Sequence, residues 1–354
     1  MKAARLYGPR DLRVEEVADP PVPPLGEVQI RVQAVGLCGS DLHTYREGRI
    51  GATAVEAPWV PGHEFAGIVH IAGSGLRDGS GEPLREGVLV AVDPSQPCGA
   101  CELCLQGHPN LCLHLRFCGL FPDDGALSDL INVPASTCFR LPEEIDAVNG
   151  AMLEPLGVAM HAVRLGGIRP GQSVSVHGAG PIGLLIIQLV RRAGADPVFV
   201  TERLPWRLKR AGEYGAVPVA EGTSSPADQI LSITHGRGVD VAIEAGWAGE
   251  LVQQALDATR FGGRVILVGI PDDDTLTMRH STARRKGLTL IFSRRMKFTY
   301  PEAIQLVRKR EVDVASLVTH RFPLPAAADA YSLNESYGDD VVKAMILPDP
   351  QLLV

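Results

Sequence analysis

A glycine-rich segment between a predicted strand and a predicted helix constrains the fold of this chain most strongly. It reads VSVHGAGPIG over residues 174–183 and spaces Gly178, Gly180 and Gly183 as G-x-G-x-x-G. The first glycine allows a tight turn, the second lets a pyrophosphate approach the backbone, and the third lets the helix pack closely on the strand. N–H groups at the start of the helix, near Pro181 and Ile182, attract phosphate oxygens. The segment predicts a dinucleotide site, although such a turn can also be merely structural.

An acidic residue follows in the position that this site requires. Glu202 lies nineteen residues beyond Gly183, at the end of the next predicted strand. Its carboxylate can accept hydrogen bonds from an adenosine ribose, which favours NAD over NADP. Arg203 follows immediately and could neutralise a 2′-phosphate, so NADP remains an alternative.

The order of predicted elements indicates two domains, as does the length of 354 residues. Residues 1–153 hold short β-branched runs separated by proline and glycine, which predict an irregular β barrel or sandwich. From about residue 172, strands and helices alternate, which predicts an α/β fold with a doubly wound parallel sheet. The tail, residues 295–354, contains one helical run at 300–309 and two short strand-like pieces. We expect it to return to the first domain.

Four of the seven cysteines lie in one turn-rich loop: Cys98, Cys101, Cys104 and Cys112. Thiolates at this spacing can converge on a tetrahedral ion, which predicts a closed, non-catalytic zinc site. A disulfide loop and an iron–sulfur site are the alternatives.

A second group of metal-type residues is spread more widely. Cys38 and His63 suit zinc, and Glu64 adjoins the histidine. Glu154 lies at the predicted junction of the two domains. Three protein ligands would leave a fourth position open for substrate, as in catalytic zinc sites. Taken singly, Cys38 could be a small core residue and His63 a buried histidine with satisfied hydrogen bonds.

Charge and composition limit the partners. The net charge of −7 provides no basic stripe for nucleic acid. The amino terminus carries charges that interrupt any signal-peptide core, and no apolar run reaches membrane-spanning length. We therefore expect a cytoplasmic protein with neither nucleic-acid nor membrane partners, in a compartment that keeps thiols reduced.

Six segments together resemble the zinc-dependent medium-chain alcohol dehydrogenase superfamily, across nearly the whole chain. They are GLCGSDLH (36–43), GHEFAG (62–67), the four-cysteine loop, EPLGVAMHA (154–162), VHGAGPIG (176–183) and VILVGI (265–270). Within that superfamily, PDDGAL (122–127) and the EPL at 154–156 resemble the polyol (sorbitol and xylitol) dehydrogenase branch.

The resemblance implies a fold and a set of metal ligands. A GroES-like catalytic domain, residues 1–153 with a structural-zinc lobe at about 94–114, would be completed by residues 295–354. A Rossmann domain, residues 154–294, would be inserted between them. Cys38, His63 and Glu64 would hold the catalytic zinc, while Glu154 is either a direct ligand or, as we prefer, holds the water on the metal.

The resemblance also implies roles for other side chains. Ser40 would accept the alcohol proton and His43 would pass it outward; the alternatives are a turn serine and a surface histidine. Further cofactor contacts are Arg207 near the adenosine ribose, Lys343 near the pyrophosphate, and Val268; both basic residues could instead be solvated charges. Phe117 and Arg294 are the candidate substrate contacts.

The sequence therefore predicts an NAD- and zinc-dependent dehydrogenase that oxidises a secondary alcohol of a polyol or sugar-type substrate to a ketone. Each chain would hold one catalytic and one structural zinc, and the chains would form a dimer or tetramer. Alternatives are an enzyme like L-threonine 3-dehydrogenase and, in another class, a non-catalytic NAD(H)-binding sensor or structural protein.

Overall fold

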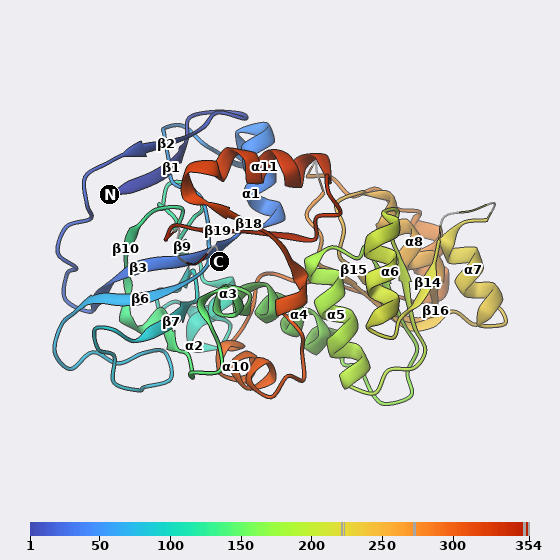
Figure 1. Ribbon diagram of the computed structural model, residues 1–354. Coiled ribbons are helices and arrows are strands. Elements are labelled where there is room, and N and C mark those ends of the chain that lie inside the picture. Colours follow the sequence, from blue (N-terminus) through green and yellow to red (C-terminus); the bar gives the residue numbers. More distant parts are fainter. Residues whose placement is uncertain (221, 223, 272–273, 350–351, 353–354) are drawn as a thin grey trace. The chain divides into compact units, whose positions relative to one another are not determined.

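The computed structural model describes residues 1–220, 222, 224–271, 274–349 and 352. The chain forms two compact units. The first contains Met1–Pro155 and Lys297–Val354, and the second contains Leu156–Met296. Figure 1 shows that blue and red segments, from the two ends of the chain, share the first unit.

The first unit is built on a seven-stranded sheet in the order β11-β7-β6-β3-β19-β18, with β10 paired to β3. Its central strand β3 (Glu27–Gly36) carries valine, isoleucine and alanine on its buried positions, as expected for a strand inside a core. The other strands are β6 (Glu64–Ala72), β7 (Leu89–Val92), β10 (Leu130–Pro134), β11 (Cys138–Arg140), β18 (Val318–Pro323) and β19 (Lys343–Leu347). This sheet confirms the predicted β-rich domain.

The remaining elements of the first unit surround this sheet. The short strands are β1 (Lys2–Leu6), β2 (Leu12–Glu16), β4 (Arg49–Ile50), β5 (Thr53–Ala54), β8 (Ser95–Gln96) and β9 (Arg116–Phe117). The helices are α1 (Gly39–Glu47), α2 (Glu102–Leu105), α3 (Ala147–Ala151), α10 (Tyr300–Arg308) and α11 (Ala327–Ser336). Short 3₁₀ turns are η1 (Pro109–Leu111), η2 (Ala135–Thr137), η3 (Ala315–Leu317) and η4 (Leu324–Ala326). Helix α4 (Leu153–Gly166) contains the boundary between the units.

The tail joins the first unit as expected, but it holds more helix than the sequence indicated. Strand β19 pairs antiparallel with β3, and β18 pairs parallel with β19. The tail contains α11 as well as α10, so the expectation of a single helical run was wrong. Helix α11 reads AADAYSLNES and begins without a side-chain cap, so neither an apolar stripe nor a capping residue marks it in the sequence.

The second unit is the predicted doubly wound sheet. Six parallel strands run in the order β14-β13-β12-β15-β16-β17, and the order reverses direction between β12 and β15. The strands are β12 (Val174–His177), β13 (Val198–Thr201), β14 (Val217–Val219), β15 (Val239–Glu244), β16 (Thr259–Leu267) and β17 (Thr289–Phe292). The helices are α5 (Pro181–Arg192), α6 (Pro205–Glu213), α7 (Pro226–Ile233), α8 (Glu250–Ala258) and α9 (His280–Lys286). Ligands bind such sheets at the carboxyl ends of the strands, where the order reverses.

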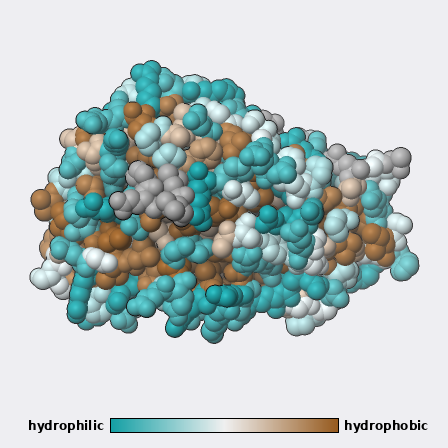
Figure 2. All heavy atoms as spheres, viewed as in Figure 1, coloured by the Kyte–Doolittle hydropathy of each residue, from teal (hydrophilic) through white to brown (hydrophobic). Residues whose placement is uncertain are grey.

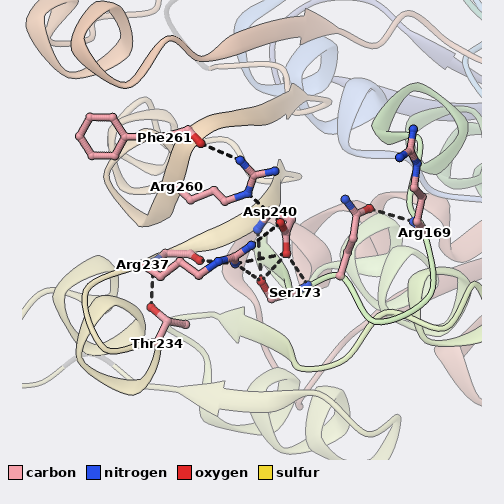
Figure 3. Close-up of polar contacts among 9 residues, drawn as sticks. Arg169, Ser173, Thr234, Arg237, Asp240, Arg260 and Phe261 are labelled. Carbon is pink, nitrogen blue, oxygen red and sulfur yellow. Dashed lines mark hydrogen bonds and ion pairs between the residues drawn. The ribbon is translucent and has the colours of Figure 1, made fainter.

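A buried carboxylate joins the amino ends of three central strands of this sheet (Figure 3). Asp240 on β15 is 8% exposed and accepts hydrogen bonds from the backbone N–H and the hydroxyl of Ser173, both at 3.0 Å. Arg237 and Arg260 each place a guanidinium nitrogen 2.7 Å from its Oδ1. Although burial by itself raises the pKa of Asp240, the two arginines and Ser173 together lower it below its usual range. Asp240 is therefore a charged and fully paired structural residue.

The surface is of mixed character. Hydrophobic residues gather over part of the displayed face of the first unit and hydrophilic ones border them (Figure 2). Within the described part of the chain, no helix combines the length and the apolar character needed to span a bilayer.

Candidate metal centres and cofactor site

The first unit brings Cys38, His63 and Glu64 together. Cys38 is the residue just before α1, and Glu64 begins β6, where it pairs with Gly36 of β3. One potential ligand atom from each residue lies within 4.8 Å of the others, and the histidine and glutamate are buried. A thiolate, an imidazole and a carboxylate are ordinary zinc ligands, so the donor set fits a zinc ion. Glu154 is not one of these three residues.

Asp41, which sequence reasoning missed, orients the histidine. Its Oδ1 lies 3.2 Å from His63 Nδ1, and its Oδ2 accepts a hydrogen bond of 3.1 Å from the Cys38 backbone N–H. Burial lowers the pKa of His63, but the charges of Asp41 and Cys38 outweigh it and raise that pKa well above its usual value. The cluster is therefore a site of negative potential that favours a cation, and Asp41 directs Nε2 of the histidine toward it.

Lys343 lies beside this cluster. It is 2% exposed, donates a hydrogen bond of 2.8 Å to the carbonyl oxygen of Leu37, and forms an ion pair with Glu64. Burial alone would lower the pKa of Lys343, but the charges of Glu64 and Cys38 raise it. The solvated-charge alternative was therefore wrong. The predicted contact with the pyrophosphate stays a prediction, and the ammonium group pairs with the carboxylate next to a metal-type histidine.

The candidate proton-transfer residues lie on α1. The hydroxyl oxygen of Ser40 is 3.5 Å from His63 Nε2, so it reaches the edge of the cluster. His43 is 4% exposed, which excludes the alternative of a surface histidine. Their placement one turn apart follows from the helical spacing of residues 40 and 43.

Two further predicted residues border the cluster. Glu154 at the start of α4 is buried, and burial raises its pKa to about 7, with His63 opposing that rise and Glu64 adding to it. The ring of Phe117 lies 5.5 Å from the ring of His63. Both residues therefore lie near the metal-type residues.

The four-cysteine loop forms the second cluster. Ligand atoms of Cys98, Cys101, Cys104 and Cys112 all lie within 4.8 Å of one another, and all four are free thiols. The sulfur of Cys112 is 3.5 Å from that of Cys98 and 3.8 Å from that of Cys101. Such distances are too long for disulfides and match about 3.8 Å, the sulfur separation of tetrahedral zinc with Zn–S bonds of about 2.3 Å. Backbone N–H groups lower the pKa of Cys101 to about 6, which favours the thiolate.

The glycine turn in the second unit has the geometry that the sequence predicted. Gly178 follows β12 with φ of +101°, and Gly180 caps α5, which begins at Pro181. A Cβ on Gly183 would overlap the carbonyl oxygen of Gly178, so only glycine permits this close helix–strand packing. Ile182 follows in the first turn of the helix. The turn fits a dinucleotide phosphate.

Residues predicted to contact the cofactor surround this turn. The carboxylate of Glu202 accepts hydrogen bonds from the backbone N–H groups of Ala179 (2.8 Å), Arg203 (2.9 Å) and Leu204 (3.0 Å). Arg207 on α6 approaches the turn, since its Nη1 would lie 3.6 Å from a Cβ placed on Gly180.

Two other predicted residues follow strands of the second unit. Val268 comes directly after β16 and donates its backbone N–H to the carbonyl oxygen of Glu244 at 2.9 Å. Arg294 is exposed, two residues beyond β17. Val268 thus lies at the carboxyl edge of the sheet, as a cofactor contact requires, whereas the role of Arg294 as a substrate contact stays a prediction.

Comparison with known proteins agrees with the sites described in both units. Residues 24–143 match the family model of the alcohol dehydrogenase GroES-like domain, and residues 181–309 match that of the zinc-binding dehydrogenases. The chain is 34% identical over 352 residues to a sorbitol dehydrogenase of Bacillus subtilis (strain 168), covering 99% of this chain and 98% of the relative.

Solved structures of similar proteins contain either cofactor. An alcohol dehydrogenase from Escherichia coli CFT073, complexed with NADH, superposes with a TM-score of 0.88 at 30% identity, covering 98% of this chain and 99% of that one. A protein from Sinorhizobium meliloti 1021 bound to NADP gives a TM-score of 0.86 at 31% identity with the same coverage. These matches indicate the same family as the two metal-type clusters and the glycine turn. The chain belongs to the zinc-dependent medium-chain alcohol dehydrogenases.

Proposed function

We propose that the protein oxidises a secondary alcohol of a polyol or sugar-type substrate to a ketone and passes the hydride to NAD. The observation that carries this proposal is the convergence of Cys38, His63 and Glu64 in a unit that also holds Ser40 and His43. The sorbitol dehydrogenase relative supports a polyol as substrate. The same relative and the two family models favour this enzyme over an amino-alcohol dehydrogenase and over a binding protein without catalytic activity.

The residues of the first unit have distinct roles in this proposal. Cys38, His63 and Glu64 would hold a catalytic zinc, and the four-cysteine loop would hold a structural one. When bound, the catalytic zinc supplies Lewis acidity to the alcohol oxygen, and NAD supplies the hydride acceptor. Ser40 would accept the hydroxyl proton while releasing its own proton toward His43, so that the serine stays neutral, and His43 would pass the proton outward. Glu154 would accept a hydrogen bond from water or substrate beside the cluster.

A substrate panel tests the proposal. Sorbitol, xylitol, iditol, galactitol and threonine would be offered with NAD, and NADH absorbance followed. Turnover of a polyol with little turnover of threonine is expected. Preference for threonine would favour the amino-alcohol rival, and turnover of none, with NADH still binding, would favour the binding protein.

Replacing Ser40 by alanine should lower kcat about 100-fold, because general acid–base groups contribute at least that factor. The zinc content should stay at the wild-type value, since Ser40 is not among the clustered donors. Ser40→Thr is the matched control, because it keeps a hydroxyl at the same position and should keep most of the activity. Unchanged turnover in Ser40→Ala would remove this residue from the mechanism.

The wild-type protein should use NAD with a kcat/KM at least about tenfold above that for NADP, since a 2′-phosphate would meet the carboxylate of Glu202. Glu202→Gln should narrow that ratio, because the amide keeps the shape of the side chain without its charge. Thermal unfolding of the variant serves as a control for the three backbone hydrogen bonds that Glu202 accepts. A large NADP advantage in the wild-type protein would contradict this role.

We also propose that the protein is a cytoplasmic homo-oligomer, a dimer or tetramer. All seven cysteines are free, including the four in the loop, which suits a reducing compartment. Light scattering coupled to size-exclusion chromatography would give the number of chains.

A further inference from the structure

Glu244 is a buried carboxylate that none of the roles above uses. It is the last residue of β15 and is 4% exposed. Its Oε1 accepts a hydrogen bond of 2.7 Å from the backbone N–H of Gly246, and its Oε2 accepts one of 3.1 Å from that of Gly269. Gly246 lies in the loop after β15 and Gly269 in the loop after β16. One side chain therefore joins two adjacent loops at the carboxyl edge of the sheet.

The loop after β15 packs directly against the glycine turn. A Cβ placed on Gly178 would lie 3.0 Å from the carbonyl oxygen of Ala245 and 3.2 Å from the backbone nitrogen of Gly246. Ala245 also donates its backbone N–H to the carbonyl oxygen of His177 at 2.9 Å. Glu244 thus accepts a hydrogen bond from the peptide between Ala245 and Gly246. The same peptide packs against the glycine turn, which is predicted to receive the pyrophosphate.

The two loops approach each other too closely for any side chain to separate them. A Cβ on Gly269 would overlap the carbonyl oxygen of Gly246 and would lie 2.5 Å from Glu244 Oε1. The packing at this edge therefore depends on two glycines and on the carboxylate between them.

Burial and hydrogen bonding act in opposite directions on the ionisation of Glu244. Burial raises the pKa of Glu244 to about 7, while the N–H groups of Gly246, Gly269 and Val268 oppose that rise. The two N–H groups that favour the ionised carboxylate, those of Gly246 and Gly269, are also the ones that join Glu244 to the two loops.

We propose that Glu244 is a positioning residue for the cofactor: it holds the loops after β15 and β16 against the glycine turn and thereby sets the affinity for NAD(H). This inference rests on the proposed use of NAD. Glu244 would act through these two loops and not by touching the reacting atoms or the metal-type clusters.

Glu244→Gln tests the proposal, because glutamine keeps the size of the side chain but turns an N–H₂ group toward one of the two backbone N–H donors. We expect the Kd for NADH, measured by fluorescence titration, to rise about tenfold, the effect of one lost hydrogen bond. The KM for NAD should rise with it, while the KM for the polyol and the zinc content stay at wild-type values. A merely structural role would lower the melting temperature without this selective change in KM.

Glu250→Gln is the matched control, since the same substitution is made at an exposed position at the start of α8 in the same unit. It should leave the Kd for NADH unchanged. Glu244→Asp is the second variant, because its shorter side chain can reach only one loop and should weaken binding to a smaller extent; it decides the question if Glu244→Gln does not fold. A variant Kd within twofold of the wild-type value overturns this inference alone. Failure of the wild-type protein to bind any nicotinamide cofactor overturns the proposed function as well.

Discussion

Replacing Cys38 by alanine is expected to lower kcat/KM for a polyol by about 1,000-fold or more, because several kcal/mol of Lewis-acid stabilisation depend on the metal that this thiolate helps to hold. Zinc measured by mass spectrometry should fall from two ions per chain to about one. The four-cysteine loop, whose ligand atoms form a separate group, should keep its ion.

Cys138→Ala is the control for this prediction. Cys138 is a fully buried free thiol on β11, and burial keeps it protonated by raising its pKa. The substitution should cost about 1 kcal/mol of stability and leave zinc content and activity unchanged. Full activity in Cys38→Ala, or loss of both zinc ions, would contradict the assignment of Cys38 to a separate catalytic site.

Replacing Asp240 by alanine is expected to lower the free energy of unfolding of the second unit by about 2 kcal/mol, the cost of leaving buried hydrogen-bond donors without an acceptor. The substitution leaves Arg237 and Arg260 without their shared carboxylate and the Ser173 N–H without its acceptor. The guanidinium groups of Arg237 and Arg260 are 54% and 33% exposed and can be solvated in the variant, so most of the cost comes from the buried N–H and hydroxyl of Ser173, which lose their acceptor. Denaturant unfolding followed by circular dichroism measures the change.

The pH dependence of this stabilisation follows from the direction of the pKa shift. The pKa of Asp240 is lower in the folded protein than in the unfolded chain. The contribution of this carboxylate to the free energy of unfolding is therefore complete above pH about 4, and it is lost as the pH falls below that value. The difference between wild type and Asp240→Ala should therefore be constant from pH 5 to 8. Asp257→Ala provides a matched control, since Asp257 pairs with the exposed Arg279 and should cost no more than about 1 kcal/mol. Equal losses in the two variants would contradict the structural role of Asp240.

The sequence predicted the fold and the metal-type residues because the evidence for them is local. The glycine turn and the four-cysteine loop are each contained in about fifteen residues or fewer, and the strand–helix alternation of the second unit repeats over short distances. The ligand set of Cys38, His63 and Glu64 is dispersed, and it was predicted from the resemblance rather than from spacing.

Side chains that act through tertiary contacts could not be predicted in this way. Lys343 reaches Glu64 only because β19 inserts beside β3, a pairing between residues some 300 positions apart. Glu244 reads in the sequence as one more residue of a buried strand, and its hydrogen bonds to two loops become evident only when those loops meet. Asp41 did leave a local signal, since it follows Cys38 by three residues, where a side chain can bind back to the start of a helix.

The position of β19 determines when the first unit can be finished during protein synthesis. Strand β3 is made early, but its carboxyl end, Val35 and Gly36, pairs with β19, which leaves the ribosome only after the whole of the second unit. The nascent chain must therefore carry an incomplete sheet with an open edge, and Glu64 must lack its lysine, while more than 200 further residues are translated. The second unit, being continuous, can fold in the meantime.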